Sequence, residues 1–567
     1  MPLPRNTITH ALIISGTLML AGCMMVGPDF ARPPVKAVDQ YKSTAQTEFT
    51  ESLGENSNKI LDPVEWWQSF NDPTLNTLLK QATAQNLTLQ QTALRIYQLQ
   101  AQLGVSDAAL LPSANLSASY SNNRNSAIQE AINDSNNLVS KNALVQMSWE
   151  IDFWGKSRRG IQSSLTSYLS GVAAFYSADV SLTADVANTY INIRNYEELI
   201  VVAKTNLALQ KESLRIAGAR FKYGATSMLD LSQAQAQYEQ TKAQIPALIA
   251  NLKKNQHAMS VLLGEPPEYY EKTYGNTKGS LKPPSELGIG MPRDLLRRRP
   301  DVLQAEFDAA SKSALIGVSK AQLFPTFTLG GLFGYATSNY GTLSSANLFS
   351  WGNNSSGVNA GLYLPLFYRG AIVDQVRVQD AIFQQSLLAY QNQVLNAQKE
   401  VEDSLITIST TKSSKEDLTR GVIAAQSAAD LALERYKAGQ NDYTTVITAQ
   451  QNLLNIQNSL VQTSSNELIG YVGAFKALGG GWTADMSPPK LPDQMITDMA
   501  DRTDWGSVLT RVGDPLTVKV GKFLVDAPDP ATSPQTPVPA KANTPSITPS
   551  NISTPSNQGS AAPWKIF

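Results

Sequence analysis

Apolar residues recur every three, four or seven positions through two long stretches of the chain. In the first stretch, residues 156–221, the apolar positions are Ile161, Leu165, Tyr168, Val172, Phe175, Leu182, Val186, Tyr190 and Ile193. This spacing is typical of coiled-coil helices, and a helix of that span would reach about 100 Å. A second stretch, residues 371–436, has the same length and the same enrichment in Ala, Gln and Leu. A narrow apolar seam in polar surroundings predicts helices packed side by side in a water-filled wall.

The positions of the prolines leave room for such helices. No proline lies between Pro112 and Pro246, or between Pro365 and Pro488. Because a proline inside a helix costs about 3 kcal/mol, these two spans leave room for very long helices.

Alternating apolar and polar residues predict four strands of about ten residues each, two before each long helix. Their apolar positions are Leu116, Ala118 and Tyr120; Ala143, Val145, Met147, Trp149, Ile151 and Phe153; Phe327, Leu329, Phe333 and Tyr335; and Val358, Ala360, Leu362, Leu364 and Leu366. Polar loops near residues 121–141 and 336–356 join the two members of each pair. A tilted strand of about ten residues is long enough to cross a bilayer.

Two interpretations of these strands stay open, a soluble sandwich and a membrane sheet. Aromatic residues gather at the strand ends as in a membrane girdle, and Glu150 and Asp152 face the opposite way from Trp149, toward a polar lumen. Four strands cannot close a barrel, and an open sheet edge is not tolerated in lipid. The membrane interpretation therefore requires further copies of the chain, and it predicts an oligomeric α+β membrane protein.

The N-terminal residues carry a targeting signal. Arg5 precedes an apolar stretch at residues 11–20. The stretch ends in Leu20, Ala21, Gly22 and Cys23. A signal peptide has a basic start, a short apolar core and small residues before its cleavage site. The last four residues also fit a bacterial lipobox. Cys23, the chain's only cysteine, is then expected to carry the lipid that anchors the protein. Met24, where aspartate often retains lipoproteins at the inner membrane, favours the outer membrane.

One unit of the sequence is duplicated in tandem. Gly104-Val105 recurs 213 residues later as Gly317-Val318, and Arg220 recurs 215 residues later as Arg435, with several further pairs at the same two offsets. A long period with two copies predicts pseudo-symmetric halves rather than a solenoid.

Composition and motifs exclude several classes of function. The net charge is −1, and the chain has two histidines and one cysteine. Two histidines and one cysteine are too few for a Cys/His zinc site or a disulfide framework. The balanced charge gives no sign of nucleic acid as a partner. No Walker loop, dinucleotide fingerprint or nucleophile elbow is present. Glu150 and Asp152 could act as paired glycosidase acids, but on an alternating strand they fit a polar lumen better. We expect no enzyme activity, no metal and no cofactor apart from the lipid on Cys23.

Short sequence blocks across residues 20–482 resemble a known family. They are Cys23, Gly27-Pro28-Asp29-Phe30, Arg32-Pro33, Trp66-Trp67, Asp72-Pro73-Thr74-Leu75, Trp149-Glu150-Ile151-Asp152-Phe153-Trp154-Gly155, Arg298-Arg299-Pro300-Asp301, Ala305-Glu306, Leu323-Phe324-Pro325, Leu364-Pro365-Leu366-Phe367 and Leu478-Gly479-Gly480-Gly481-Trp482. In this order they resemble the TolC family of outer-membrane efflux channels, in its lipid-anchored, OprM-like branch. The resemblance implies a homotrimer. Its 12-stranded transmembrane β-barrel, four strands per chain, would continue into a periplasmic α-helical coiled-coil barrel with a mixed equatorial domain.

With this resemblance the chain divides into six parts. They are a lipoprotein signal peptide at 1–22, a lipidated N-terminal and equatorial segment at 23–75, a first efflux repeat at 76–270, an equatorial linker at 271–292, a second efflux repeat at 293–482 and a C-terminal extension at 483–567. From about residue 526 the extension is dominated by Pro, Ser, Thr and Ala, a composition that predicts disorder.

The resemblance also implies that the turn after each long helix lies at the periplasmic tip, where it closes the pore and docks on the adaptor. The candidate residues are Arg220, Lys222, Gly224 and Asp230 in one turn and Arg435, Lys437, Gly439 and Asp442 in the other. Helix capping is the alternative role, because glycine ends helices and basic residues favour the last turn. Thr448 stands where relatives commonly have aspartate, so Asp230 and Asp442 are weaker substitutes for a gate carboxylate.

The predicted function is passive conduction through the outer-membrane channel of a tripartite efflux system. The expected partners are a periplasmic membrane-fusion adaptor, an inner-membrane transporter of RND type (or of ABC or MFS type), outer-membrane lipid and two further copies of the chain. Two alternatives stay open. One is a type I protein secretion outlet of the same architecture, and the other is a non-channel periplasmic coiled-coil lipoprotein scaffold.

Overall fold

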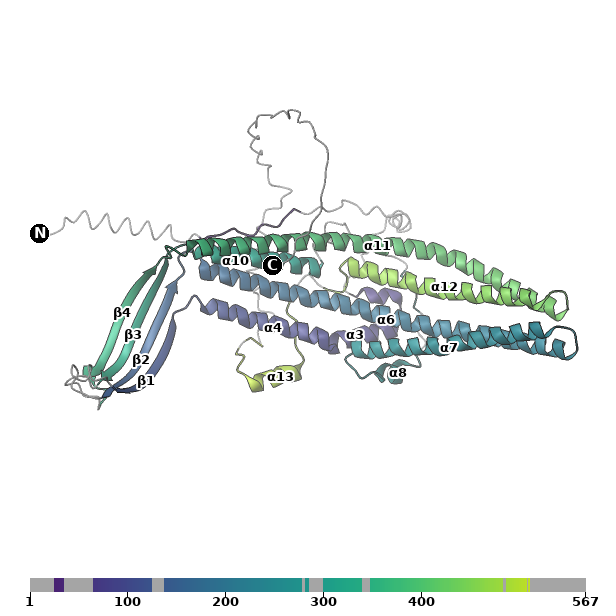
Figure 1. Cartoon of the computed structure of the whole chain (residues 1–567), viewed down its shortest axis with the longest axis horizontal. Helices are drawn as coiled ribbons and strands as arrows, with labels where there is room; N and C mark the ends of the chain where they lie inside the picture. The colour runs from purple at the N-terminus through teal and green to yellow at the C-terminus, as the bar shows by residue number, and fades with distance from the viewer. Residues whose placement is uncertain are drawn as a thin grey trace, which may run out of the picture. The chain divides into compact units, whose positions relative to one another are not determined.

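The computed structural model describes residues 25–34, 65–124, 137–277, 281–284, 299–338, 347–482, 486–506 and 508–509. These residues run twice through one order of elements: a helix, a strand hairpin, a very long helix and a shorter returning helix (Figure 1). The first pass comprises α4 (Leu87–Ala108), β1 (Ser113–Arg124), β2 (Asn137–Ile151), α6 (Lys156–Lys222) and α7 (Met228–Leu262). The second comprises α10 (Pro300–Ala321), β3 (Thr326–Ser338), β4 (Asn354–Tyr363), α11 (Arg369–Lys437) and α12 (Tyr443–Ala477).

Corresponding helices of the two passes have nearly equal lengths, as a tandem duplication predicts. The long helices α6 and α11 have 67 and 69 residues. The returning helices α7 and α12 have 35 residues each, and α4 and α10 have 22 each. The prediction of two very long helices is therefore confirmed, with bounds within two residues of those expected.

The helices pack in pairs, α6 with α7 and α11 with α12, and α12 also lies against α6 (Figure 1). The seam between α6 and α12 includes three polar side-chain pairs. Its hydrogen bonds join Asn195 to Ser465 at 3.0 Å, Asn206 to Gln457 at 2.6 Å and Ser213 to Gln450 at 2.8 Å. Such paired amides and hydroxyls satisfy groups that would otherwise be costly to bury. Among the described helices, none is both long and apolar enough to cross a bilayer.

Short elements fix the middle of the long helices: η1 (Trp66–Phe70), α3 (Pro73–Gln85) and α8 (Tyr269–Tyr274). Trp66 stacks on Phe475 of α12 with ring centroids 5.1 Å apart. The carboxylate of Asp72 caps α3, accepting from the backbone N–H of Thr74 at 2.8 Å, and also accepts from the hydroxyl of Tyr190 on α6 at 3.0 Å. An N-cap of this kind stabilises the helix start by about 1 kcal/mol.

The four strands form one antiparallel sheet in the order β1-β2-β3-β4. The two repeats meet where β2 pairs with β3, with Val145 opposite Phe333. Within the chain β1 and β4 each have only one neighbour, so the sheet has two open edges. Large apolar side chains such as Leu116, Val358 and Leu362 are exposed on this sheet, which marks it as a surface that meets lipid or protein.

The predicted strand bounds need three corrections. β1 and β2 run into the predicted polar loop, to Arg124 and from Asn137. β4 ends at Tyr363, so Leu364 and Leu366 lie beyond it, since Pro365 cannot donate to a strand ladder. β2 ends at Ile151, so Phe153 and Asp152 lie outside the strand, and Asp152 was wrongly predicted as a strand residue.

The described part of the C-terminal extension packs on the first repeat. The hydroxyls of Tyr97 on α4 and Tyr176 on α6 donate to the backbone carbonyls of Pro489 at 3.1 Å and Ser487 at 2.6 Å. The helix α13 (Asp493–Arg502) follows. The predicted disorder from about residue 526 falls outside the described residues.

Candidate functional site

The first helical turn, residues 223–227, joins α6 to α7 and is built by a glycine. Gly224 has φ +72°, the left-handed conformation that only glycine adopts cheaply. The backbone N–H of Ala225 then donates to the carbonyl of Arg220 at 2.8 Å and closes the end of α6. The hydroxyl of Ser227 accepts from the backbone N–H of Asp230 and caps the start of α7.

The second helical turn, residues 438–442, joins α11 to α12 in the same way. Gly439 has φ +76°, and the backbone N–H of Gln440 donates to the carbonyl of Arg435 at 2.8 Å. The side chain of Asp442 caps α12, because it accepts from the backbone N–H and the hydroxyl of Thr445 at 3.3 and 3.0 Å. The equal geometry explains why both glycines recur at the 215-residue offset.

Arg220 connects the two turns. Its guanidinium donates to the backbone carbonyl of Tyr436 at the end of α11 and to that of Ala225 at 3.2 Å. The guanidinium carbon also lies 4.5 Å from the centroid of the Tyr436 ring, a cation–π contact. The structure therefore places Arg220 of the first repeat against the second.

Two buried tyrosines form the core beneath this contact. Tyr436 and Tyr443 meet edge to face with centroids 5.1 Å apart. They belong to one apolar cluster on the four helices that flank the turns: Ile216, Ala217, Ala234, Ala432, Tyr436, Tyr443 and Val446. Burial raises the pKa of both hydroxyls above the usual value, so both stay neutral at physiological pH.

The other predicted residues of the turns also make contacts close to the turn in which they stand. Asp230 accepts a hydrogen bond from the hydroxyl of Thr226, four residues earlier. Lys437 forms an exposed ion pair with Glu434 at 2.8 Å, and Asp442 is an N-cap. Asp230 also interacts electrostatically with the hydroxyl of Tyr436 on the opposite helix pair, so Arg220 is not alone in linking the two turns.

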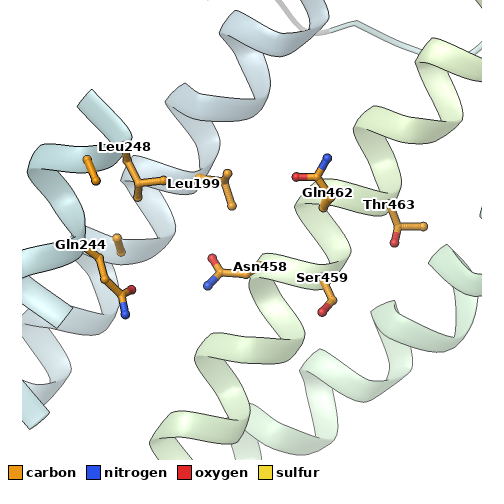
Figure 2. Close-up of a pocket in the computed structure, with 9 residues that line it drawn as sticks. Leu199, Gln244, Leu248, Asn458, Ser459, Gln462 and Thr463 are labelled. Carbon is orange, nitrogen blue, oxygen red and sulfur yellow. The ribbon is translucent and has the colours of Figure 1, made fainter. Parts of the chain in front are cut away.

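A groove of about 650 Å³ lies between α6, α7 and α12 (Figure 2). Its lining residues are Leu199, Ala203, Gln244, Ala247, Leu248, Asn458, Ser459, Gln462 and Thr463. Leucines and alanines come from α6 and α7, while α12 contributes amides and hydroxyls (Figure 2). No lining side chain is charged at neutral pH, so the groove has no acid, base or cation-binding cluster of the kind that a hydrolytic site uses.

The predicted lumen residues lie where β2 meets α6. Glu150 forms a partly exposed ion pair with Lys156 at 3.0 Å. Asp152 instead turns toward the helix and accepts from the backbone N–H groups of Ser157 at 3.1 Å and Arg158 at 2.9 Å. Its position after the strand is explained by this capping role, since a carboxylate satisfies free N–H groups at a helix start and favours the helix dipole.

A segment near the N-terminus is held by hydrogen bonds and ion pairs at the junction of β2 with α6. The backbone N–H of Val26 donates to the carbonyl of Trp154 at 3.1 Å. Arg159, almost fully buried, donates to the carbonyls of Val26 and Gly27 at 3.2 and 3.3 Å and pairs with Asp29 at 2.8 Å. Arg32 pairs with the buried Glu306 of the second repeat at 2.7 Å. Residues 25–32 therefore bind both repeats beside the strand ends.

The lipobox residues lie outside the described residues. Leu20, Ala21, Gly22 and Cys23 directly precede the clamped segment in sequence. Arg159, Tyr436 and Tyr443 were not singled out from the sequence. The 215-residue offset, which relates Phe221 to Tyr436 and Met228 to Tyr443, was the available signal for the two tyrosines.

The profile of the outer membrane efflux protein family matches residues 78–265 and 291–480. The chain belongs to the outer membrane efflux protein family. Its role is that of an outer-membrane efflux channel, and the family and fold are those of channel proteins. It is 29% identical over 476 residues to nodulation protein T of Rhizobium leguminosarum bv. trifolii, covering 82% of this chain and 96% of the relative. It is 30% identical over 427 residues to the pyoverdine export outer membrane protein OpmQ of Pseudomonas aeruginosa, covering 74% and 88%.

A solved structure gives the same result for the fold. The outer-membrane channel OprN superposes with a TM-score of 0.72 at 27% identity, covering 81% of this chain and 99% of that one. The resemblance inferred from the short sequence blocks is therefore confirmed at the level of the family.

Proposed function

We propose that three copies of the chain assemble into one channel. Their sheets would close a 12-stranded barrel in the bacterial outer membrane, and their long helices would line a periplasmic tunnel. The observation that carries this proposal is the four-stranded sheet with two open edges and exposed apolar side chains. Open edges are not tolerated in lipid, so β1 of one copy must pair with β4 of another. The strands, of 10 to 15 residues, are long enough to cross a bilayer when tilted.

A lipid on Cys23 would hold this assembly in the outer membrane. Residue 25 begins a segment that is hydrogen-bonded to Trp154 and Arg159, at the junction of β2 with α6. An acyl chain attached two residues earlier would therefore lie close to the strand ends, where the membrane surface is expected. Replacing Cys23 by serine should abolish incorporation of labelled palmitate. Persistent labelling of that variant would overturn this part of the proposal.

The two turns would form the periplasmic tip that closes the pore at rest and docks on a membrane-fusion adaptor. Support comes from the Arg220 contact, which binds the ends of α6 and α11 together, and from the exposed backbone of both glycine turns. An inner-membrane transporter, of RND, ABC or MFS type, would supply the energy. The chain itself would conduct passively.

Efflux of small molecules is favoured over protein secretion by the relative named for pyoverdine export. A non-channel scaffold is disfavoured, because the apolar residues on the sheet would then have no partner. Single-channel recording of the purified lipidated protein in planar bilayers tests the proposal, beside native mass spectrometry of its oligomeric state. A trimer with small, rare openings is expected. A folded protein that is monomeric and never conducts would point to the scaffold.

A further inference from the structure

The register of the four strands divides the sheet into an apolar face and a mainly polar face. Residues directly opposite each other on antiparallel strands share a face. The apolar face carries Leu116, Val145, Met147, Leu329, Phe333 and Val358. The other face carries Ser117, Asn142, Gln146, Glu150, Thr328 and Asn359. In the proposed channel, the apolar face would meet lipid and the polar face would line the lumen.

Charged residues are distributed unevenly over the two faces. Within the four strands only Arg124, Lys141 and Glu150 are charged. Glu150 lies on the polar face, near the end of β2 that joins α6. Lys141, opposite Tyr120, and Arg124, opposite Asn137, lie on the apolar face. Both cations are in the half of the sheet remote from the helices (Figure 1).

Lys141 lies at the border of the apolar band. On β2 the band runs from Ile151, beside α6, to Ala143, the last residue on this face before Lys141. Lys141 is 10 residues from Ile151, which is about 34 Å along a strand. At a strand tilt of about 40°, this corresponds to about 26 Å along the membrane normal, and outer-membrane barrels have an apolar band of about 25 Å. Lys141 therefore lies at the level expected for lipid headgroups.

The groups around Lys141 fit a phosphorylated sugar headgroup. Tyr120, directly opposite Lys141, is 65% exposed, and a tyrosine ring with its hydroxyl suits the boundary between apolar and polar surroundings. Asn122 follows on the same face and offers an amide to sugar hydroxyls. Arg124, next on this face and exposed, can bind a phosphate through two parallel hydrogen bonds. Tyrosine and asparagine thus lie between two cations along one strip of surface.

We propose that Arg124 and Lys141 bind the phosphates of a glycolipid in the outer leaflet of the outer membrane, with Tyr120 and Asn122 against its sugars. Basic side chains at a membrane surface attract anionic lipid headgroups. The strand ends remote from the helices would face the cell exterior, because the helices of the proposed channel lie in the periplasm. Since β1 is an edge strand, the lipid would lie beside the seam between two copies.

This inference rests on the proposed channel but makes a separate claim about the lipid that surrounds it. Native mass spectrometry of the purified full-length trimer, with lipid A as the probe, tests it. Lipid A that carries its phosphates should be retained, and lipid A without phosphates should bind much more weakly. The variant Arg124→Ala/Lys141→Ala should weaken binding about thirtyfold, since each basic residue near an anionic surface contributes about fivefold.

Two controls separate charge from folding and from general electrostatics. The variant Arg124→Lys/Lys141→Arg keeps both charges and should retain most of the binding. Lys211→Ala removes an exposed charge from α6, outside the sheet, and should leave lipid binding unchanged. Channel recording of each variant in planar bilayers should give the conductance of the parent, because the substituted residues lie outside the lumen.

The outcomes distinguish the lipid site from the channel itself. A conducting trimer that binds both forms of lipid A equally, or that binds as well in the double alanine variant, would overturn the inference and leave the channel standing. Displacement of the lipid by excess inorganic phosphate would indicate a site for the free anion and would also overturn it. A parent protein that is monomeric and never conducts would overturn the proposed function, and the inference with it.

Discussion

Arg220, in the last turn of α6, holds the end of α11 through the backbone carbonyl and the ring of Tyr436. A cation–π contact contributes about 0.5–2 kcal/mol and a hydrogen bond from a charged group about 1.5–3 kcal/mol. If the tip must separate these ends to open, Arg220→Ala should raise the open fraction of the channel about tenfold or more, since about 1.4 kcal/mol corresponds to a factor of ten. Single-channel recording in planar bilayers measures this.

The matched control for that experiment is Lys222→Ala. Lys222 is a basic residue of the same last turn but is exposed, and its side chain makes no hydrogen bond or ion pair with the described residues of the second repeat. Its removal should leave the open fraction within about twofold of the parent value, as is usual for an exposed charge. Equal effects of the two substitutions would show that positive charge at the tip, rather than the Tyr436 contact, controls opening.

Gly27 permits the close approach of the N-terminal segment to α10. Its φ is +100°, and a Cβ there would lie 2.4 Å from the Cα of Gly317. Gly27→Ala should therefore release residues 25–32 at a cost of about 1–3 kcal/mol for the strained backbone. We expect faster limited proteolysis in this segment. Gly104→Ala, at an open helical position, should not increase cleavage. Unchanged protection in Gly27→Ala would mean that the segment is held without the glycine contact.

The carboxylate of Asp152 stabilises the start of α6 through the N–H groups of Ser157 and Arg158. Asp152→Ala should lower stability by about 0.5–2 kcal/mol, the usual cost of a lost cap, and reduce the thermal midpoint of the helical circular dichroism signal. Glu150→Ala removes only a partly exposed ion pair and should cost less than about 1 kcal/mol. A larger effect at Glu150 than at Asp152 would contradict the capping role.

Asp179 on α6 is half-buried, and removal of its carboxyl group from water raises its pKa to about 6. Its Oδ1 atom has no hydrogen-bond partner among the described residues. Because the folded pKa lies above the unfolded value of 3.8, the folded state binds the proton more tightly. Stability should therefore fall as pH rises from about 4 to 6 and then level off. Asp179→Asn removes the buried charge and should raise the melting temperature at pH 8 but not at pH 4.

Asp185→Asn provides the control, since Asp185 is exposed on the same helix. Melting curves of both variants and the parent at pH 4, 6 and 8 would distinguish the cases. A difference between Asp179→Asn and the parent that does not change with pH would mean that the carboxyl group does not titrate in this range.

The long helices could be predicted from the sequence because their information is local. Apolar spacing from Ile161 to Ile193 and the absence of proline fixed α6 almost to the residue, and the repeat at 215 residues predicted its partner α11. The strands were found by the same period argument, but their ends were less well predicted. Asp152 continues the alternation of β2 and yet caps α6, because the helix start competes for its carboxylate.

The pattern of the chain by itself determined the duplication, the helices, the strands, the glycine turns and the family. Only the tertiary structure decided which turn residues meet. Arg220 and Arg435 are equivalent in sequence, but one is held by Tyr436 and the other is exposed. The physical reason is that a duplicated unit encodes each packing surface twice, whereas a single folded chain can bury only one of the two copies.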